Sequence, residues 1–118
     1  MNIWQVIGAF FGAAGVGAGA MASHAVADAH AADMVTLAAI YALIHAAVLV
    51  CWGGTGKIAT AARIALSGGI ALFSGAIALK YLIPLALPAF FAPVGGSLLM
   101  LAWLLIAISA FAHKNRAL

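Results

Sequence analysis

Two side chains capable of proton transfer or ligand binding, Tyr41 and His45, lie four residues apart in a long apolar stretch of the chain. Residues at this spacing share one face of a helix, so the phenol and the imidazole are expected to point the same way. A neutral imidazole can accept or donate a hydrogen bond and can ligate a metal or a haem iron. The pair is therefore the first place to look for chemistry.

The position of His45 favours burial inside a membrane. Helical rise puts it about 16 Å from the start of the apolar stretch Met34–Trp52, near the middle of a bilayer. Lipid offers no hydrogen-bond partner, so the ring must bond within the protein or serve a ligand. Ser67 and Ser74 share a face of the next apolar stretch. We interpret Tyr41, His45, Ser67 and Ser74 as a buried polar site, in which the ring bonds to one of the other three or to a backbone carbonyl.

Histidine and aspartate also gather before this stretch, at His24, Asp28 and His30. Such side chains bind transition metals, but the spacing fits no regular ligand pattern, so we predict no metal site. The chain offers no arrangement of nucleophile, base and acid, and we therefore predict no catalytic residue, no enzyme activity and no cofactor. The apolar stretches contain no carboxylate, which argues against a proton-driven antiporter.

Composition defines the elements that must position these side chains. Of 118 residues, 68% are hydrophobic and 6% are charged, whereas a soluble domain has about 25% charged residues. About 20 apolar residues cross a bilayer as a helix, and the chain has room for four such runs with short loops. We predict one all-α domain over residues 1–118, a four-transmembrane-helix bundle with spans at about 3–21, 34–52, 61–82 and 94–112.

The first span carries glycine at a spacing that favours close helix packing. Gly8 and Gly12 are four residues apart, as are Gly15 and Gly19. Association in lipid depends on close approach of backbones, which small residues allow. We expect this face to pack, either against another helix of the same bundle or against a second copy of the chain.

The loops are predicted from capping and helix-breaking residues. Residues 23–33 are expected to form the first loop, with Asp33 capping the second helix because it directly precedes the apolar run. Pro84, Pro88 and Pro93 are expected to separate the third and fourth spans, so that the fourth span begins after Pro93.

The charges indicate a topology rather than a nucleic-acid partner. The net charge is +3, but the basic residues are at span ends and form no single patch. Four spans put both termini and the second loop on one side, where Lys57, Arg63, Lys114 and Arg116 outnumber the single Lys80 of the other side. Because the positively charged side faces the cytoplasm, both termini are expected there.

An ordered set of short motifs runs over nearly the whole chain. Gly19–His24 reads GAMASH, Tyr41 opens a Y-x-x-x-H-A stretch, Leu72–Gly75 reads LFSG, and Pro93–Gly96 reads PVGG and is followed by WLL from Trp103. The set resembles the small bacterial integral-membrane family catalogued as domain of unknown function 423. The first motif departs from the family pattern at residues 21–23.

The resemblance implies four transmembrane helices in a bacterial inner membrane, and it implies no reaction. It draws attention to the motif positions His24, His45, Ser74, Gly75, Pro93, Gly95 and Gly96.

Three functions stay open on the sequence. The first is a non-enzymatic packing or accessory subunit, whose partners are the lipid bilayer and either further copies, in a homo-oligomer, or a larger membrane complex. The second is a carrier or channel for a small neutral or hydrophobic solute along the Tyr41–His45 face. The third is a lipid, quinone or haem site near His45. We rank the first highest because a membrane histidine needs a partner before it needs a substrate.

Overall fold

The computed structural model describes residues 1–83 and 85–117, without the side chains of residues 113 and 115–117. Pro84 and the Arg116 side chain, used in the expectations above, lie outside the described residues. The described part of the chain consists of helices and the loops between them and contains no strand. Its elements are α1 (Ile3–His24), α2 (Ala29–Cys51), α3 (Lys57–Ile70), the π-helical turn η1 (Ala71–Gly75), α4 (Ala76–Leu82) and α5 (Phe91–Ala117).

The predicted all-α, four-helix architecture is confirmed. Since α3, η1 and α4 run on as one rod, the structure has four helices long and apolar enough to cross a membrane: Ile3–His24, Ala29–Cys51, Lys57–Leu82 and Phe91–Ala112. A bilayer-spanning helix needs about 20 residues, and each of these exceeds that length. The chain therefore has the build of a small membrane protein.

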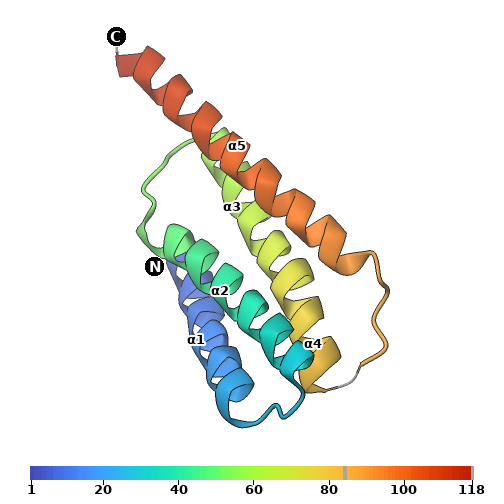
Figure 1. The fold of residues 1–118 in the computed structure, drawn as a ribbon. Helices are drawn as coiled ribbons and strands as arrows, with labels where there is room; N and C mark the ends of the chain where they lie inside the picture. The colour runs from blue at the N-terminus through green and yellow to red at the C-terminus, as the bar shows by residue number, and fades with distance from the viewer. Residues whose placement is uncertain (84, 118) are drawn as a thin grey trace.

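The four rods pack as two neighbouring pairs (Figure 1). Helix α1 lies along α2, and the rod made of α3, η1 and α4 lies along α5. Successive rods alternate in direction, so both termini point toward the same end, and α5 projects beyond the other helices there. The longest dimension of the bundle is 56 Å.

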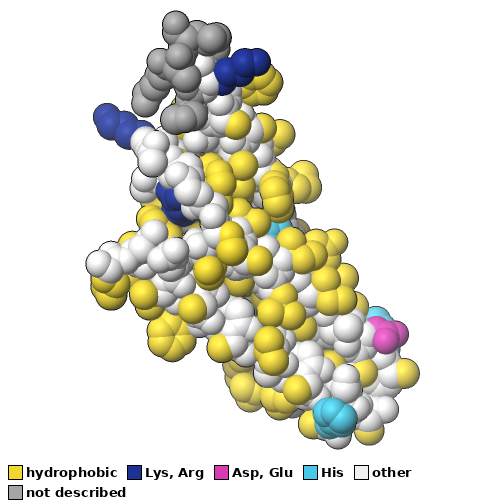
Figure 2. Space-filling view, turned by 90° about the vertical axis from the view of Figure 1, so that its left-hand side faces the viewer, with side chains coloured by type: hydrophobic (Ala, Val, Ile, Leu, Met, Phe, Trp, Pro, Cys, Tyr) yellow, Lys and Arg dark blue, Asp and Glu magenta, His cyan; other side chains and the backbone are white. Residues whose placement is uncertain are grey.

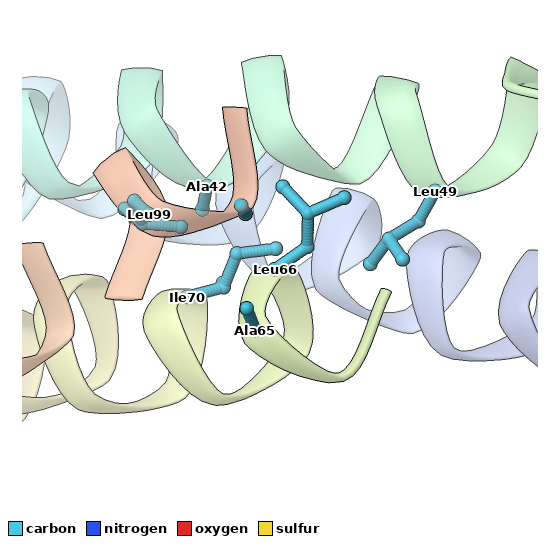
Figure 3. Close-up of a cluster of buried hydrophobic side chains, with 7 residues drawn as sticks. Ala42, Leu49, Ala65, Leu66, Ile70 and Leu99 are labelled. Carbon is cyan, nitrogen blue, oxygen red and sulfur yellow. The ribbon is translucent and has the colours of Figure 1, made fainter. Parts of the chain in front are cut away.

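The two pairs meet in a small apolar core (Figure 3). Leu66 and Ile70 of α3 lie between Leu49 of α2 and Leu99 of α5. Alanines complete the cluster, and their small side chains let the helices come close in a setting where lipid tails are as apolar as the core. The core comprises Ala42, Leu49, Ala65, Leu66, Ile70, Leu99 and Ala102.

Large apolar side chains cover the outside of the bundle. Phe10, Met100 and Leu104 are 74%, 69% and 63% exposed. Figure 2 shows hydrophobic side chains over most of one face, with lysine and arginine near one end and an acidic side chain near the other. An apolar belt between charged ends suits a molecule surrounded by lipid.

The expected first loop and its cap are wrong. α1 continues to His24 and α2 begins at Ala29, where the Asp28 side chain accepts a hydrogen bond from the Ala31 nitrogen at 2.8 Å. Both aspartates have the side chain that a cap requires, and the alanine-rich residues between them favour helix strongly. The helix therefore starts at the earlier aspartate, and Asp33 lies inside α2.

The expected starts of the third and fourth spans are also too late. The third rod begins at Lys57, directly after Gly56, whose φ of 96° suits a residue without a side chain. Helix α5 begins at Phe91, so Pro93 lies within its first turn. A proline is tolerated there because the first N–H groups of a helix have no intrahelical partner.

The third rod contains the π-helical turn η1 where α5 begins to pack against it. A Cβ atom at Gly95 would lie only 2.3 Å from the backbone nitrogen of Phe73. The backbones of α5 and η1 therefore touch directly, which only glycine allows at this position. The two motifs LFSG and PVGG meet at this contact.

Candidate functional site

The His45 side chain is buried, with 4% of its surface exposed, and both of its ring nitrogens are bonded. Nδ1 lies within hydrogen-bond distance of the Tyr41 carbonyl oxygen, one helical turn earlier. Nε2 lies 3.1 Å from Nε1 of Trp103, which belongs to α5. The imidazole thus joins α2 to α5.

These two contacts determine the tautomer of the ring. An indole N–H can only donate, so Nε2 of His45 must be the acceptor and carries no proton. The proton of the neutral ring is then on Nδ1, which donates to the Tyr41 carbonyl. A ring in this state has no free nitrogen for a metal or a haem iron.

Aromatic rings surround the imidazole. The Tyr41 ring lies nearly parallel to it at 6.1 Å between centroids, and the Trp103 ring meets it edge to face at 5.9 Å. Phe73 of η1 packs edge to face against Tyr41 at 5.2 Å. Beside these rings is a recess of about 400 Å³ between α2, η1 and α5, whose wall includes Gly96 and Met100.

The structure separates the four residues of the predicted polar site. Tyr41 and His45 lie together, but Ser67 donates to the carbonyl of Arg63 within its own helix at 2.9 Å. Ser74 lines a different cavity, on the side of η1 that faces α1. One partner of the imidazole is a backbone carbonyl, as the sequence allowed, namely that of Tyr41. The other is the Trp103 side chain, which the sequence reasoning did not assign to it.

The glycine face of α1 lies against α2 of the same chain. A Cβ at Gly8 would lie 2.8 Å from Leu49, and one at Gly15 would lie 3.0 Å from Leu43. Gly12 and Gly19 also face α2, at ordinary contact distance from alanine side chains. Of the two expectations for this face, the geometry matches packing within one bundle.

The remaining motif positions lie in α1, η1 and α5 and have different neighbours. His24 ends α1, and Gly75 has open space where a side chain would be. Gly96 faces the Phe73 ring at 3.6 Å. His30 lies 3.5 Å from the Tyr81 hydroxyl through Nε2, and among the residues that the structure describes, no three histidine, cysteine or acidic side chains are grouped as metal ligands would be.

Arg63 is a buried polar residue that the sequence reasoning did not assign to a site. Its Nη2 donates to the carbonyls of Trp52 and Gly54 at 3.0 and 2.7 Å, and its guanidinium lies 4.7 Å from the Trp52 ring centroid. An arginine about two turns inside an apolar helix needs hydrogen-bond acceptors within the protein. The glycine-rich loop before the helix supplies backbone carbonyls for this purpose. The position of Arg63 inside the apolar run was the feature of the sequence that could have indicated this contact.

The comparison with protein families decides what the chain is related to. The family model described as "Protein of unknown function (DUF423)" matches residues 18–96, well over half of the chain. The chain belongs to this family. The match confirms the resemblance seen in the short motifs. The matched part of this DUF423 protein includes Tyr41, His45, η1 and Gly95, and it ends before Trp103. The comparisons with curated proteins and with solved structures give no match.

Proposed function

We propose that this DUF423 protein is a non-enzymatic, multi-pass protein of the bacterial inner membrane that acts as an accessory or self-associating subunit. The observation that carries the proposal is the closed bonding of His45. Both nitrogens of the buried imidazole are used by groups of the same chain, so the ring holds α2 and α5 together. A group bonded in this way is a poor acid, base or ligand, because any such role first breaks an internal hydrogen bond.

The outer helices supply the surface for association. Only 17% of the apolar segment of α1 and 22% of that of α5 are buried within the bundle, against 39% for α2. Their outward faces carry large apolar side chains such as Phe10, Val16 and Leu104. Helices of a second copy or of a larger membrane complex can pack there by van der Waals contact, as membrane helices do.

The proposed orientation places both termini in the cytoplasm. Lys57 and Lys114 lie toward the end of the bundle that holds the termini, while Lys80 lies toward the other end. Basic residues near span ends favour the cytoplasmic side.

Cross-linking in native membranes tests the subunit role. Val16→Cys and Leu104→Cys, each made with Cys51→Ser, place a single thiol on the exposed side of α1 or α5. We expect at least one of them to form a cross-link to a second copy or to another membrane protein, while the buried control Leu66→Cys forms none. Native mass spectrometry in mild detergent should then show the same assembly. A strictly monomeric particle without cross-links or co-purifying protein would contradict the proposal.

The recess beside Tyr41 favours a second candidate function, the binding of a lipid or quinone. Its aromatic wall and open side suit an apolar molecule from the bilayer, and the 40% exposed Tyr41 ring can contact it. A haem is a poorer fit because His45 has no free nitrogen. A carrier for small solutes would need the same recess to open to both sides in turn.

Extraction of purified protein tests this candidate. Wild-type protein should retain a lipid or quinone in stoichiometric amount, and Met100→Trp, which narrows the recess, should reduce that amount several-fold. Leu104→Trp, at an exposed position that does not line the recess, is the control. Protein free of any extractable lipid or quinone would remove the candidate.

A further inference from the structure

A second cavity lies on the other side of η1, between α1, α2 and the third rod. It has a volume of about 150 Å³, and its wall is made almost entirely of small apolar residues. Its lining includes Gly15, Ala18, Ala39, Ala42, Ser74 and Gly75. The Ser74 hydroxyl is the one polar side-chain group among the residues that line it.

The Ser74 hydroxyl is buried and has no hydrogen-bond partner among the described residues, with 4% of the residue exposed. Other helical hydroxyls in this chain donate to the carbonyl four residues earlier, as in Ser23, Thr36, Thr60, Ser67 and Ser97. Ser74 lies in the π-helical turn η1 and makes no such bond. Its donor is therefore left for a group outside the chain.

Buried hydroxyls in folded proteins are bonded almost without exception, so an unbonded one beside a cavity indicates a missing acceptor. A water molecule is a poor occupant, because it needs two to four polar partners and this wall provides one. A cavity of about 150 Å³ with an apolar wall holds a molecule of about the size of benzene. A transmembrane helix, about 10 Å wide, is too large.

The depth of Ser74 in the membrane further restricts which molecules can accept its hydrogen bond. It lies about 12 Å along the helix from Leu82, inside the hydrocarbon layer. The ester groups of phospholipids stay at the interface, so they do not reach it. Molecules that dissolve in the hydrocarbon do.

We propose that this cavity binds a small neutral molecule from the lipid phase, with an apolar body the size of one six-membered ring and one oxygen that accepts a hydrogen bond from Ser74. Cyclic ketones, phenols and cyclic alcohols of that size belong to this class. The inference is independent of the proposed subunit role, since it concerns a different surface from the exposed faces of α1 and α5.

Ligand-observed NMR with cyclohexanone tests the proposal, using the full chain in lipid nanodiscs and empty nanodiscs as the blank. Methylenecyclohexane, which has the same shape without the oxygen, is the matched probe. We expect saturable binding of cyclohexanone that Ser74→Ala weakens about 5-fold, the loss of roughly one hydrogen bond. Binding of methylenecyclohexane should be unchanged by Ser74→Ala.

A second pair of variants tests the place of binding. Ala18→Leu fills the cavity and should abolish saturable binding of both probes, whereas Ala13→Leu, exposed on the same helix, should leave both unchanged. The proposal is overturned if cyclohexanone shows no saturable binding, if Ser74→Ala binds it as tightly as wild type, or if folded Ala18→Leu retains it. Should Ala18→Leu fail to fold, the ketone comparison with Ser74→Ala still decides.

Discussion

The imidazole of His45 joins two helices whose backbones hardly approach each other. Helix α2 contributes the ring and the carbonyl that receives its proton, and α5 contributes the Trp103 indole. In lipid neither group can turn to solvent, so each depends on the other. The hydrogen bond between His45 and Trp103 therefore connects α2 to α5 in the middle of the bundle.

Trp103→Phe should destabilise the folded protein by about 1–3 kcal/mol, because Nε2 of His45 loses its donor while it stays buried. Thermal unfolding in detergent measures the change. Trp4→Phe is the control, since it makes the same substitution at a tryptophan that packs against the apolar core and is not bonded to His45. Equal unfolding temperatures for Trp103→Phe and wild type would show that the hydrogen bond contributes little.

For single residues, the sequence predicted that His45 is buried and allowed its bond to a backbone carbonyl, but it did not predict the bond to Trp103. The spacing of Tyr41 and His45 put them on one face, as the structure has them. Trp103 is 58 residues away in the chain, and pairing it with His45 requires knowing how α5 is rotated. Hydropathy carries no information on the rotation of a helix that is apolar on all sides.

Among the elements, the contact between η1 and α5 depends on one glycine of an adjacent pair. Gly95→Ala places a Cβ 2.3 Å from the Phe73 nitrogen, so the helices must separate, at a cost of about 1–3 kcal/mol or more. Gly96→Ala meets only the Phe73 ring at 3.6 Å and should be neutral or slightly stabilising. Unfolding temperatures of the two variants give the comparison, and equal values would contradict the close backbone contact.

The loop between α2 and α3 depends on Arg63. Arg63→Gln removes the charge that bonds the Trp52 and Gly54 carbonyls, so hydrogen exchange at the bonded amides that flank the loop, those of Trp52 and Thr60, should rise several-fold. Arg63→Lys keeps the charge but loses the planar fork, and it should give an intermediate rate. Unchanged exchange in both variants would mean that the loop is held by other contacts.

Helix existence was predictable and helix ends were not. The apolar runs predicted four rods. The predicted N-cap was wrong because two residues, Asp28 and Asp33, are both able to cap the second helix. The apolar run of the third span gives no sign of the π-helical turn η1. It is visible only once α5 is in place against Leu72 and Phe73.

For the whole molecule, the one free cysteine offers a test of orientation. Cys51 is exposed at the end of α2, toward the end of the bundle that holds both termini. If that end is cytoplasmic, a membrane-impermeant maleimide should label Cys51 in inverted membrane vesicles and not in intact spheroplasts. Lys80→Cys with Cys51→Ser is the control for the other side and should react in spheroplasts. Labelling of Cys51 in spheroplasts would reverse the topology.

Both nitrogens of the buried His45 ring are bonded inside the bundle, and nitrogen NMR of histidine-labelled protein in nanodiscs reads this state directly. We predict that the His45 ring carries its proton on Nδ1 and that Nε2 accepts a hydrogen bond from the Trp103 indole. A proton on Nε2 or a doubly protonated ring would contradict the account, because the indole could then not donate to it.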